Sequence, residues 1–237
     1  MLKHQITYHV YSEKALLISW EEQTTDMISR RTTAERQIKK LFKEAVHINH
    51  GTYSILVVAE LEMDHNEVID LIDKRLQSKK SLEPATSLWK LPILYDIEKS
   101  LTEALKPTCD FKKIISIHSS SIYVVDFIGF LPGFPYLNGL DSRLQLPRKT
   151  TPSLKVAAGS VAVSNEYCGI YPTSSPGGWH VLGNCPLPIF DVHRASPSLL
   201  QSGDQVQFYA VSQEEHDQLI AQRETGILEL ENFKSHV

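Results

Sequence analysis

The chain has 237 residues, enough for one large domain or two of ordinary size. Hydrophobic residues make up 42% and charged residues 22%, which is typical of a globular protein with a substantial core and excludes a disordered chain. The net charge is −4 and basic residues occur only in scattered pairs, which argues against a nucleic-acid-binding surface.

The N-terminal sequence MLKHQITYHVYSEK contains neither the apolar region nor the cleavage site of a signal peptide, and no apolar run approaches the ~20 residues of a membrane span. We therefore expect a cytoplasmic protein that binds no membrane. The three cysteines are scattered without a CxxC pair, and no HxxxH or HxH motif occurs. These spacings favour neither a disulfide framework nor a metal site.

The N-terminal third predicts a small α+β domain. Residues 5–10 alternate apolar and polar side chains, and residues 15–20 follow after a polar turn, which indicates a hairpin. An apolar stripe from Met27 to Ala45, after a Thr25-Asp26 N-cap, predicts a long helix. Residues 52–58 are rich in β-branched residues and predict a strand, and residues 64–76 predict a second amphipathic helix. This order fits a ferredoxin-like arrangement with both helices on one face.

A polar joint at 78–87 contains Pro84 and predicts a domain boundary, with one domain at 1–84 and a second at 85–237. The second domain should begin with a strand at 87–95 and two helical stretches, 97–106 and 110–120, of which the latter has Asp110 as its N-cap. A strand at 121–131 should follow. Short apolar runs then alternate with turns at 155–164, 167–172, 179–183, 187–192 and 204–211. This spacing predicts an all-β barrel or sandwich, followed by a C-terminal helix and tail.

Glycine and proline are concentrated in this second domain: residues 129–188 hold eight of the 11 glycines and eight of the 12 prolines. Four stretches, 129–140, 146–160, 168–172 and 175–183, each place a rigid turn beside a polar or aromatic side chain. Loops of this kind commonly line a ligand cleft. Gly177 and Gly178 would permit either positive φ or close approach of the backbone to a ligand.

Few polar groups in these stretches can carry chemistry. Arg148 can present its guanidinium to a carboxylate or phosphate, and the N–H and hydroxyl of Ser160 can converge on an anion. His118 is either a helix-terminal histidine or a proton-transfer group. Tyr136, Tyr171 and Trp179 are either walls of the cleft or core residues. No Walker loop, G-x-S-x-G or G-x-G-x-x-G motif is present, so the residues alone predict a cleft but no reaction.

The four stretches contain the blocks F-x-P-G-F-x-Y-L-x-G-L-D, P-R-x-x-x-P, V-x-A-G-S-V, G-I-Y-P and S-P-G-G-W, in this order. Together with His118-Ser119, they resemble a family variously called allophanate hydrolase subunit 1, inhibitor of sporulation histidine-kinase autophosphorylation, and the B subunit of the bacterial ATP-dependent 5-oxoprolinase. The resemblance is strong over residues 85–210. It departs from the family pattern at Ser153 and Ala157, which replace an arginine and a proline, at His180 after G-G-W, and at 94–104, where a glycine-rich segment is missing.

The resemblance implies a ferredoxin-like domain followed by a cyclophilin-like β-barrel. It implies a protein that acts with the C and A subunits of 5-oxoprolinase to open 5-oxoproline to L-glutamate at the expense of ATP, together with Mg²⁺. Arg148, Ser160 and the Gly177–Gly178 backbone would stabilise the negative charge that develops during the reaction, and His118 would transfer a proton. The cleft would be lined by Gly133, Phe134, Tyr136, Gly159, Tyr171, Ser175, Gly177, Gly178, Trp179 and His180.

Two other functions remain open at this point. The barrel would act as an inhibitor if it docked on a histidine kinase, with Phe134, Tyr136 and Trp179 as anchors of the interface. The third family name suggests an allophanate hydrolase component, although the chain shows no amidase signature.

Overall fold

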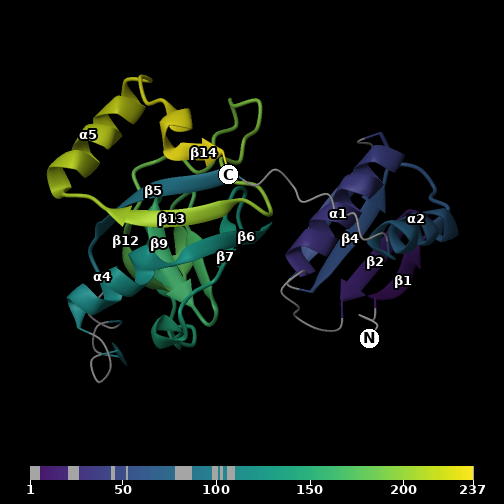
Figure 1. Cartoon of the computed structure of the whole chain (residues 1–237), viewed down its shortest axis with the longest axis horizontal. Coiled ribbons are helices and arrows are strands. Elements are labelled where there is room, and N and C mark those ends of the chain that lie inside the picture. Colours follow the sequence, from purple (N-terminus) through teal and green to yellow (C-terminus); the bar gives the residue numbers. More distant parts are fainter. Residues whose placement is uncertain are drawn as a thin grey trace. The chain divides into compact units, whose positions relative to one another are not determined.

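The computed structural model in Figure 1 describes residues 6–20, 27–43, 46–51, 53–77, 87–97, 101, 104–105 and 110–236. The chain divides into two compact units, Met1–Ala85 and Thr86–Val237, and each is described by itself. Within the described residues, we find no helix with the length and apolar character needed to span a bilayer.

The N-terminal unit is a four-stranded antiparallel sheet covered by two helices. Its elements are β1 (Ile6–Ser12), β2 (Ala15–Trp20), α1 (Met27–Leu41), β3 (Val46–Gly51), β4 (Ser54–Ala59) and α2 (His65–Gln77). The strand order is β1-β2-β4-β3. Alternate residues of β2 and β4 are buried, and they share one core with Ile38 of α1 and Ile72 of α2, so both helices cover the same face.

The hairpin and both helices that the sequence predicts in this unit are confirmed, and the strand expected at 52–58 is observed as β4. Strand β3 was not predicted, because its sequence VHINHG has too little apolar content. The expected N-cap at Thr25-Asp26 and the end of the stripe at Ala45 lie outside the described residues.

The C-terminal unit is built on a closed barrel of seven strands that fits the cyclophilin-like fold, which resolves the choice between barrel and sandwich. Around the barrel the order is β12-β9-β10-β7-β6-β13-β5, and β5 returns to β12. The strands are β5 (Ser87–Tyr95), β6 (Ile122–Ile128), β7 (Pro135–Asn138), β9 (Ser160–Ser164), β10 (Tyr167–Ile170), β12 (His180–Asn184) and β13 (Gln205–Ala210).

The remaining elements of this unit are α4 (Phe111–Ser120), η1 (Ser142–Leu144), β8 (Ser153–Val156), β11 (Ser175–Gly177), α5 (Gln213–Glu224), η2 (Leu230–Phe233) and β14 (Lys234–His236). Asp110 caps α4 as predicted, since its carboxylate accepts a hydrogen bond from the Lys113 N–H at 2.8 Å. The helix predicted at 97–106 lies mostly outside the described residues. The run 187–192 makes only a single bridge, between Phe190 and Ser198, and is not a full strand.

Strand β5 closes the barrel. One of its edges pairs in parallel with β13. It also pairs antiparallel with β14 through residues 87–89 and with β12 through Leu94 and Tyr95. Pro92, which has no N–H to donate, lies between these two antiparallel segments. The C-terminal tail predicted from sequence therefore ends as a strand of the sheet.

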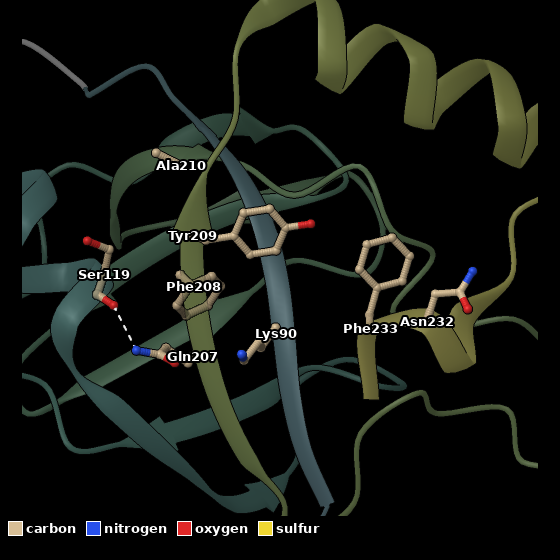
Figure 2. A pocket seen from close by; sticks show the side chains of 8 residues that line it. All are labelled: Lys90, Ser119, Gln207, Phe208, Tyr209, Ala210, Asn232 and Phe233. Carbon is tan, nitrogen blue, oxygen red and sulfur yellow. Dashed lines mark hydrogen bonds between the residues drawn. The ribbon is translucent and has the colours of Figure 1, made fainter. Parts of the chain in front are cut away.

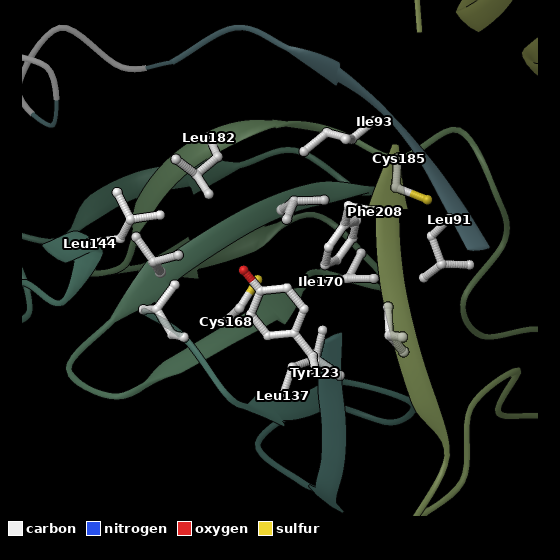
Figure 3. Packing of buried hydrophobic residues seen from close by; sticks show 14 of the residues in the cluster. Leu91, Ile93, Tyr123, Leu137, Leu144, Cys168, Ile170, Leu182, Cys185 and Phe208 are labelled. Carbon is white, nitrogen blue, oxygen red and sulfur yellow. The ribbon is translucent and has the colours of Figure 1, made fainter. Parts of the chain in front are cut away.

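The barrel interior is filled by side chains from every strand (Figure 3). In β10, the side chains of Cys168 and Ile170 belong to this interior core, whereas Tyr167 belongs to a separate cluster on the outer face of the sheet. This alternation follows from the two-residue period of a strand. The unit consequently has two packed layers, one inside the barrel and one over the strands β7, β9 and β10.

Candidate functional site

All four glycine- and proline-rich stretches meet in the cluster on the outer face of the barrel, which we call the outer aromatic cluster. It consists of Phe134, Val156, Ala162, Tyr167, Tyr171 and Trp179, with Leu131, Tyr136 and Val181 packed against it. Each stretch contributes at least one of these side chains. The sequence prediction that these loops gather at one place is therefore confirmed.

Phe134 lies at the centre of this cluster. Its ring packs edge-to-face against Tyr171 at 5.1 Å, Tyr136 at 5.2 Å and Trp179 at 5.4 Å between ring centroids. Such pairs contribute about 0.5–1.5 kcal/mol each beyond the burial of their area. Phe134 and Trp179 are 1% and 7% exposed, so neither ring is available as an anchor for a partner protein. The exposed ring on this side is Phe130, which sequence reasoning did not single out.

Two glycines allow the rings to approach the backbone. A Cβ on Gly169 would lie 2.7 Å from Cζ of Phe134 and 2.9 Å from Cζ3 of Trp179, and a Cβ on Gly177 would collide with the Tyr171 hydroxyl. Neither Gly177 nor Gly178 has positive φ, whereas Gly133 and Gly159 both have φ of +79°. Gly177 is thus required for the close approach of the Tyr171 ring to the backbone, and its expected approach to a ligand stays a prediction.

Arg148 projects beside this cluster from a backbone that is fixed on both sides. The Lys149 N–H donates to the Gly178 carbonyl at 2.8 Å, and Nε2 of His180 donates to the Pro147 carbonyl at 3.0 Å. The Arg148 side chain is exposed, and its Nε lies 3.8 Å from the position that a Cβ of Gly178 would take. The structure therefore places Arg148 beside the backbone of Gly178 and close to His180.

Two donors at this place are not used within the described part of the chain. The Arg148 guanidinium forms no ion pair with any residue in the described part of the chain, and no hydrogen bond of the Gly178 N–H is found there either. Burial raises the pKa of Tyr136 above its ordinary value, and the positive charge of Arg148 acts in the opposite direction. A guanidinium, an amide N–H and a phenol suit a carboxylate or phosphate.

Lys149 is a site residue that sequence reasoning missed. Its ammonium donates a hydrogen bond to Oγ of Ser153 at 3.2 Å. Ser153 is the position at which the family pattern has an arginine, so the neighbouring lysine places a positive charge where the substitution removed one. No sequence signal indicates this contact, because it depends on the turn between the two residues.

The backbone around Ser160 is used within the fold. Its N–H donates to the Ala157 carbonyl at 3.2 Å, and the Gly159 N–H donates to the Tyr171 carbonyl at 2.7 Å. Ser160 itself is buried. The expectation that the Ser160 N–H converges on an anion is therefore wrong. Ser175 likewise uses its hydroxyl locally, on the Pro176 carbonyl at 3.1 Å.

His118 lies inside the barrel, away from the outer aromatic cluster. It is fully buried, with Nδ1 2.8 Å from the Tyr95 hydroxyl and Nε2 3.5 Å from Sγ of Cys168, and its ring stacks on Phe208. Burial lowers its pKa to about 3. Cys168 faces the interior and Gly169 faces the cluster, so the β10 strand separates His118 from the cleft residues. A proton-transfer role for His118 remains a prediction.

This burial predicts a pH dependence of stability. An unfolded chain protonates His118 below about pH 6.5, whereas the native state does so only near pH 3, so stability is lost as pH falls from 6.5 towards 3. Between pH 6.5 and 5 the loss should be about 2 kcal/mol. His118→Gln should remove this part of the dependence in urea denaturation at pH 7 and pH 5. The matched control is the exposed His193→Gln, and an unchanged pH dependence in H118Q would contradict the assignment.

Comparison with known proteins gives the family. The model of the family described as "Carboxyltransferase domain, subdomain C and D" matches residues 6–200. The chain belongs to this family.

Several carboxyltransferase-domain relatives are similar over much of the chain. The Haemophilus influenzae protein named as the B subunit of 5-oxoprolinase is 32% identical over 202 residues, which are 83% of this chain and 94% of that protein. A protein of the same name from Escherichia coli O157:H7 is 38% identical over 145 residues, which are 60% of this chain and 66% of that protein. Another, from Bacillus subtilis, is 41% identical over 105 residues, which are 44% of this chain and 44% of that protein.

Solved structures of other proteins share this fold. A crystal structure of TTHA0988 has a TM-score of 0.72 at 24% identity and covers 84% of this chain, which spans 40% of the TTHA0988 chain. The Pyrococcus horikoshii protein PH0987 is 28% identical and has a TM-score of 0.51. The match covers 89% of this chain and 100% of PH0987. The K. lactis urea amidolyase shares the fold, with a TM-score of 0.67 at 19% identity over 94% of this chain and 16% of the amidolyase.

Proposed function

We propose that this chain is the B subunit of an ATP-dependent 5-oxoprolinase and that it acts in a complex with the C and A subunits. Its relatives named as B subunits of 5-oxoprolinase support this reading, above all the one matched over 94% of its length. The reaction would convert 5-oxoproline, ATP and water to L-glutamate, ADP and phosphate, and would take place in the cytoplasm.

The observation that carries the proposal at the level of chemistry is the set of donors at Arg148, Gly178 and Tyr136. A lactam amide is a poor electrophile, and ring opening develops negative charge on its oxygen. ATP would supply the phosphoryl group that makes this oxygen a leaving group. The guanidinium and the N–H of Gly178 would hold the resulting anionic group, and Lys149 would add a second positive charge close by.

The residues present fit an anionic phosphate but offer no site for Mg²⁺. Among the described residues we find no group of three or more His, Cys, Asp or Glu side chains that could hold a metal ion. We therefore assign Arg148, Tyr136 and Gly178 to the anion and none of the described residues to the metal. The remaining predicted residues would pack behind the cleft and hold its walls in place: Trp179, Phe134, Tyr171, Gly133, Gly159 and His180.

The finer division of the fold is also part of the proposal. We infer domains at 1–84 and 85–237, the first of them a variant of the ferredoxin-like type. In the order β1-β2-β4-β3, the edge place beside β2 is taken by the first strand of the chain. The usual fold fills this place with a strand that follows α2.

The proposed function is tested by 5-oxoproline-dependent ATP hydrolysis, measured with this chain alone and then mixed with its candidate A and C subunits. We expect turnover only in the full mixture. A stable complex of all three chains without turnover would contradict the proposal, and an assay of histidine-kinase autophosphorylation would then be the next experiment.

A further inference from the structure

A groove of about 610 Å³ lies on the outer side of the barrel, over β5 and β13 (Figure 2). It is lined by Lys90, Ser119, Gln207, Phe208, Tyr209, Ala210, Asn232 and Phe233. The end of α4 borders it at Ser119, and η2 borders it at Asn232 and Phe233. None of these residues belongs to the outer aromatic cluster, so the groove is separate from the site proposed above. Its volume lies within the range of small-molecule sites, roughly 300–1,000 Å³.

One end of the groove is cationic. Lys90 and Gln207 are directly paired in the parallel register of β5 and β13, so their side chains lie next to each other on the outer face. The Gln207 amide donates to the Ser119 carbonyl at 3.4 Å and is thereby turned towards α4 (Figure 2). Lys90 makes no ion pair within the part of the chain that the structure covers, and no lining residue is acidic. Its ammonium is therefore available to an anion.

The other end is aromatic. Tyr209 is 40% exposed, and Phe233 is half-buried. In Figure 2 the Tyr209 hydroxyl points across β5 towards Phe233, and Lys90 lies below the two rings. Two partly exposed aromatic side chains on either side of a groove offer stacking and edge contacts to a flat ring.

We propose that this groove binds a small organic anion in which a carboxylate or phosphate is attached to a flat ring. The acid group lies on Lys90, and the ring lies between Tyr209 and Phe233. A simple inorganic anion would leave the aromatic end unused, and an uncharged ring would leave Lys90 unpaired. The inference does not depend on the proposed function, because the whole groove belongs to this chain.

The test is calorimetric titration of the full chain, without other proteins, with two ring-bearing anions of different source: adenosine monophosphate and benzoate. The matched probes are adenosine and benzamide, which keep the ring without the charge, and inorganic phosphate and acetate, which keep the charge without the ring. We expect at least one ring-bearing anion to bind at least tenfold more tightly than both of its matched probes. Phosphate and carboxylate sources are then distinguished by which one does so.

Variants locate the binding. Lys90→Met should lower the affinity for the anion about tenfold. Lys90→Arg should keep most of the affinity, because it keeps the charge. Tyr209→Leu should also weaken binding, and the exposed Lys155→Met on β8 should leave it unchanged. Equal affinity for the anions and their matched probes would overturn the proposal. Undiminished binding by a folded K90M protein would do the same. If the K90M protein does not fold, Tyr209→Leu and Lys90→Arg still test whether the anion binds in this groove.

Discussion

Arg148→Ala is expected to lower the 5-oxoproline-dependent turnover of the reconstituted complex by about 10²–10³-fold, the effect of losing one preorganised donor to a developing negative charge. Arg148 is exposed and makes no ion pair among the residues whose placement is described, so its loss should leave the thermal midpoint of the chain almost unchanged. A large effect on activity without an effect on stability would separate a role in the site from a role in the fold.

The kinetic form of the loss identifies what Arg148 binds. If it holds only a charge that develops during the reaction, kcat falls and KM stays constant; if it holds a substrate carboxylate throughout, KM rises. Arg148→Lys should recover little activity, because a single ammonium cannot replace a planar two-pronged donor. The matched control is the exposed Lys155→Ala on β8. Wild-type turnover in R148A would remove Arg148 from the proposed site.

Gly169→Ala is expected to destabilise the barrel unit by about 3 kcal/mol, at the upper end of the cost of overpacking a core. The added methyl group would overlap Cζ of Phe134 and Cζ3 of Trp179. Both rings are held by several neighbours, and β10 is paired on both sides by β7 and β9, so neither the rings nor the strand can move aside easily. Urea denaturation followed by tryptophan fluorescence measures the loss.

Gly178→Ala is the matched control for this substitution. Its Cβ would meet its nearest neighbours at 3.8 Å, an ordinary contact, and its φ is not positive. We expect a stability change within about 0.5 kcal/mol. Combining Gly169→Ala with Phe134→Leu should recover part of the lost stability, because the smaller side chain makes room for the methyl group. Equal stability of G169A and G178A would contradict the close packing of the two rings on Gly169.

Much of the fold could be predicted because its signals are local. Alternation and β-branched content indicated β2, β4 and every barrel strand except β7, and Asp110 marked the start of α4. Strand β3, which pairs with the adjacent β4, was missed because its own six residues have little apolar content. Strand β14 was missed because its three residues become a strand only when a partner far along the chain is present. Propensity within the segment carries no information about that partner.

The site was predicted in the same uneven way. The glycines and prolines correctly marked the loops that form the outer aromatic cluster. The positions of His118 and Ser160 could not be read from sequence, because they depend on the side of the sheet that a residue faces and on which N–H groups the turns already use. A one-residue change of register decides between the two faces of β10, and the short sequence YCGI has no alternating pattern that would fix that register.

The pairing of β5 bears on how the protein is made. During synthesis the strand Ser87–Tyr95 leaves the ribosome long before any of its partners, since β12, β13 and β14 begin at residues 180, 205 and 234. At ordinary elongation rates this delay is roughly ten seconds, far longer than local collapse requires. Throughout it, a strand with the apolar sequence LWKLPILY has both edges open and can aggregate with neighbouring chains. The nascent chain should therefore depend on chaperones until β12, β13 and β14 have been added.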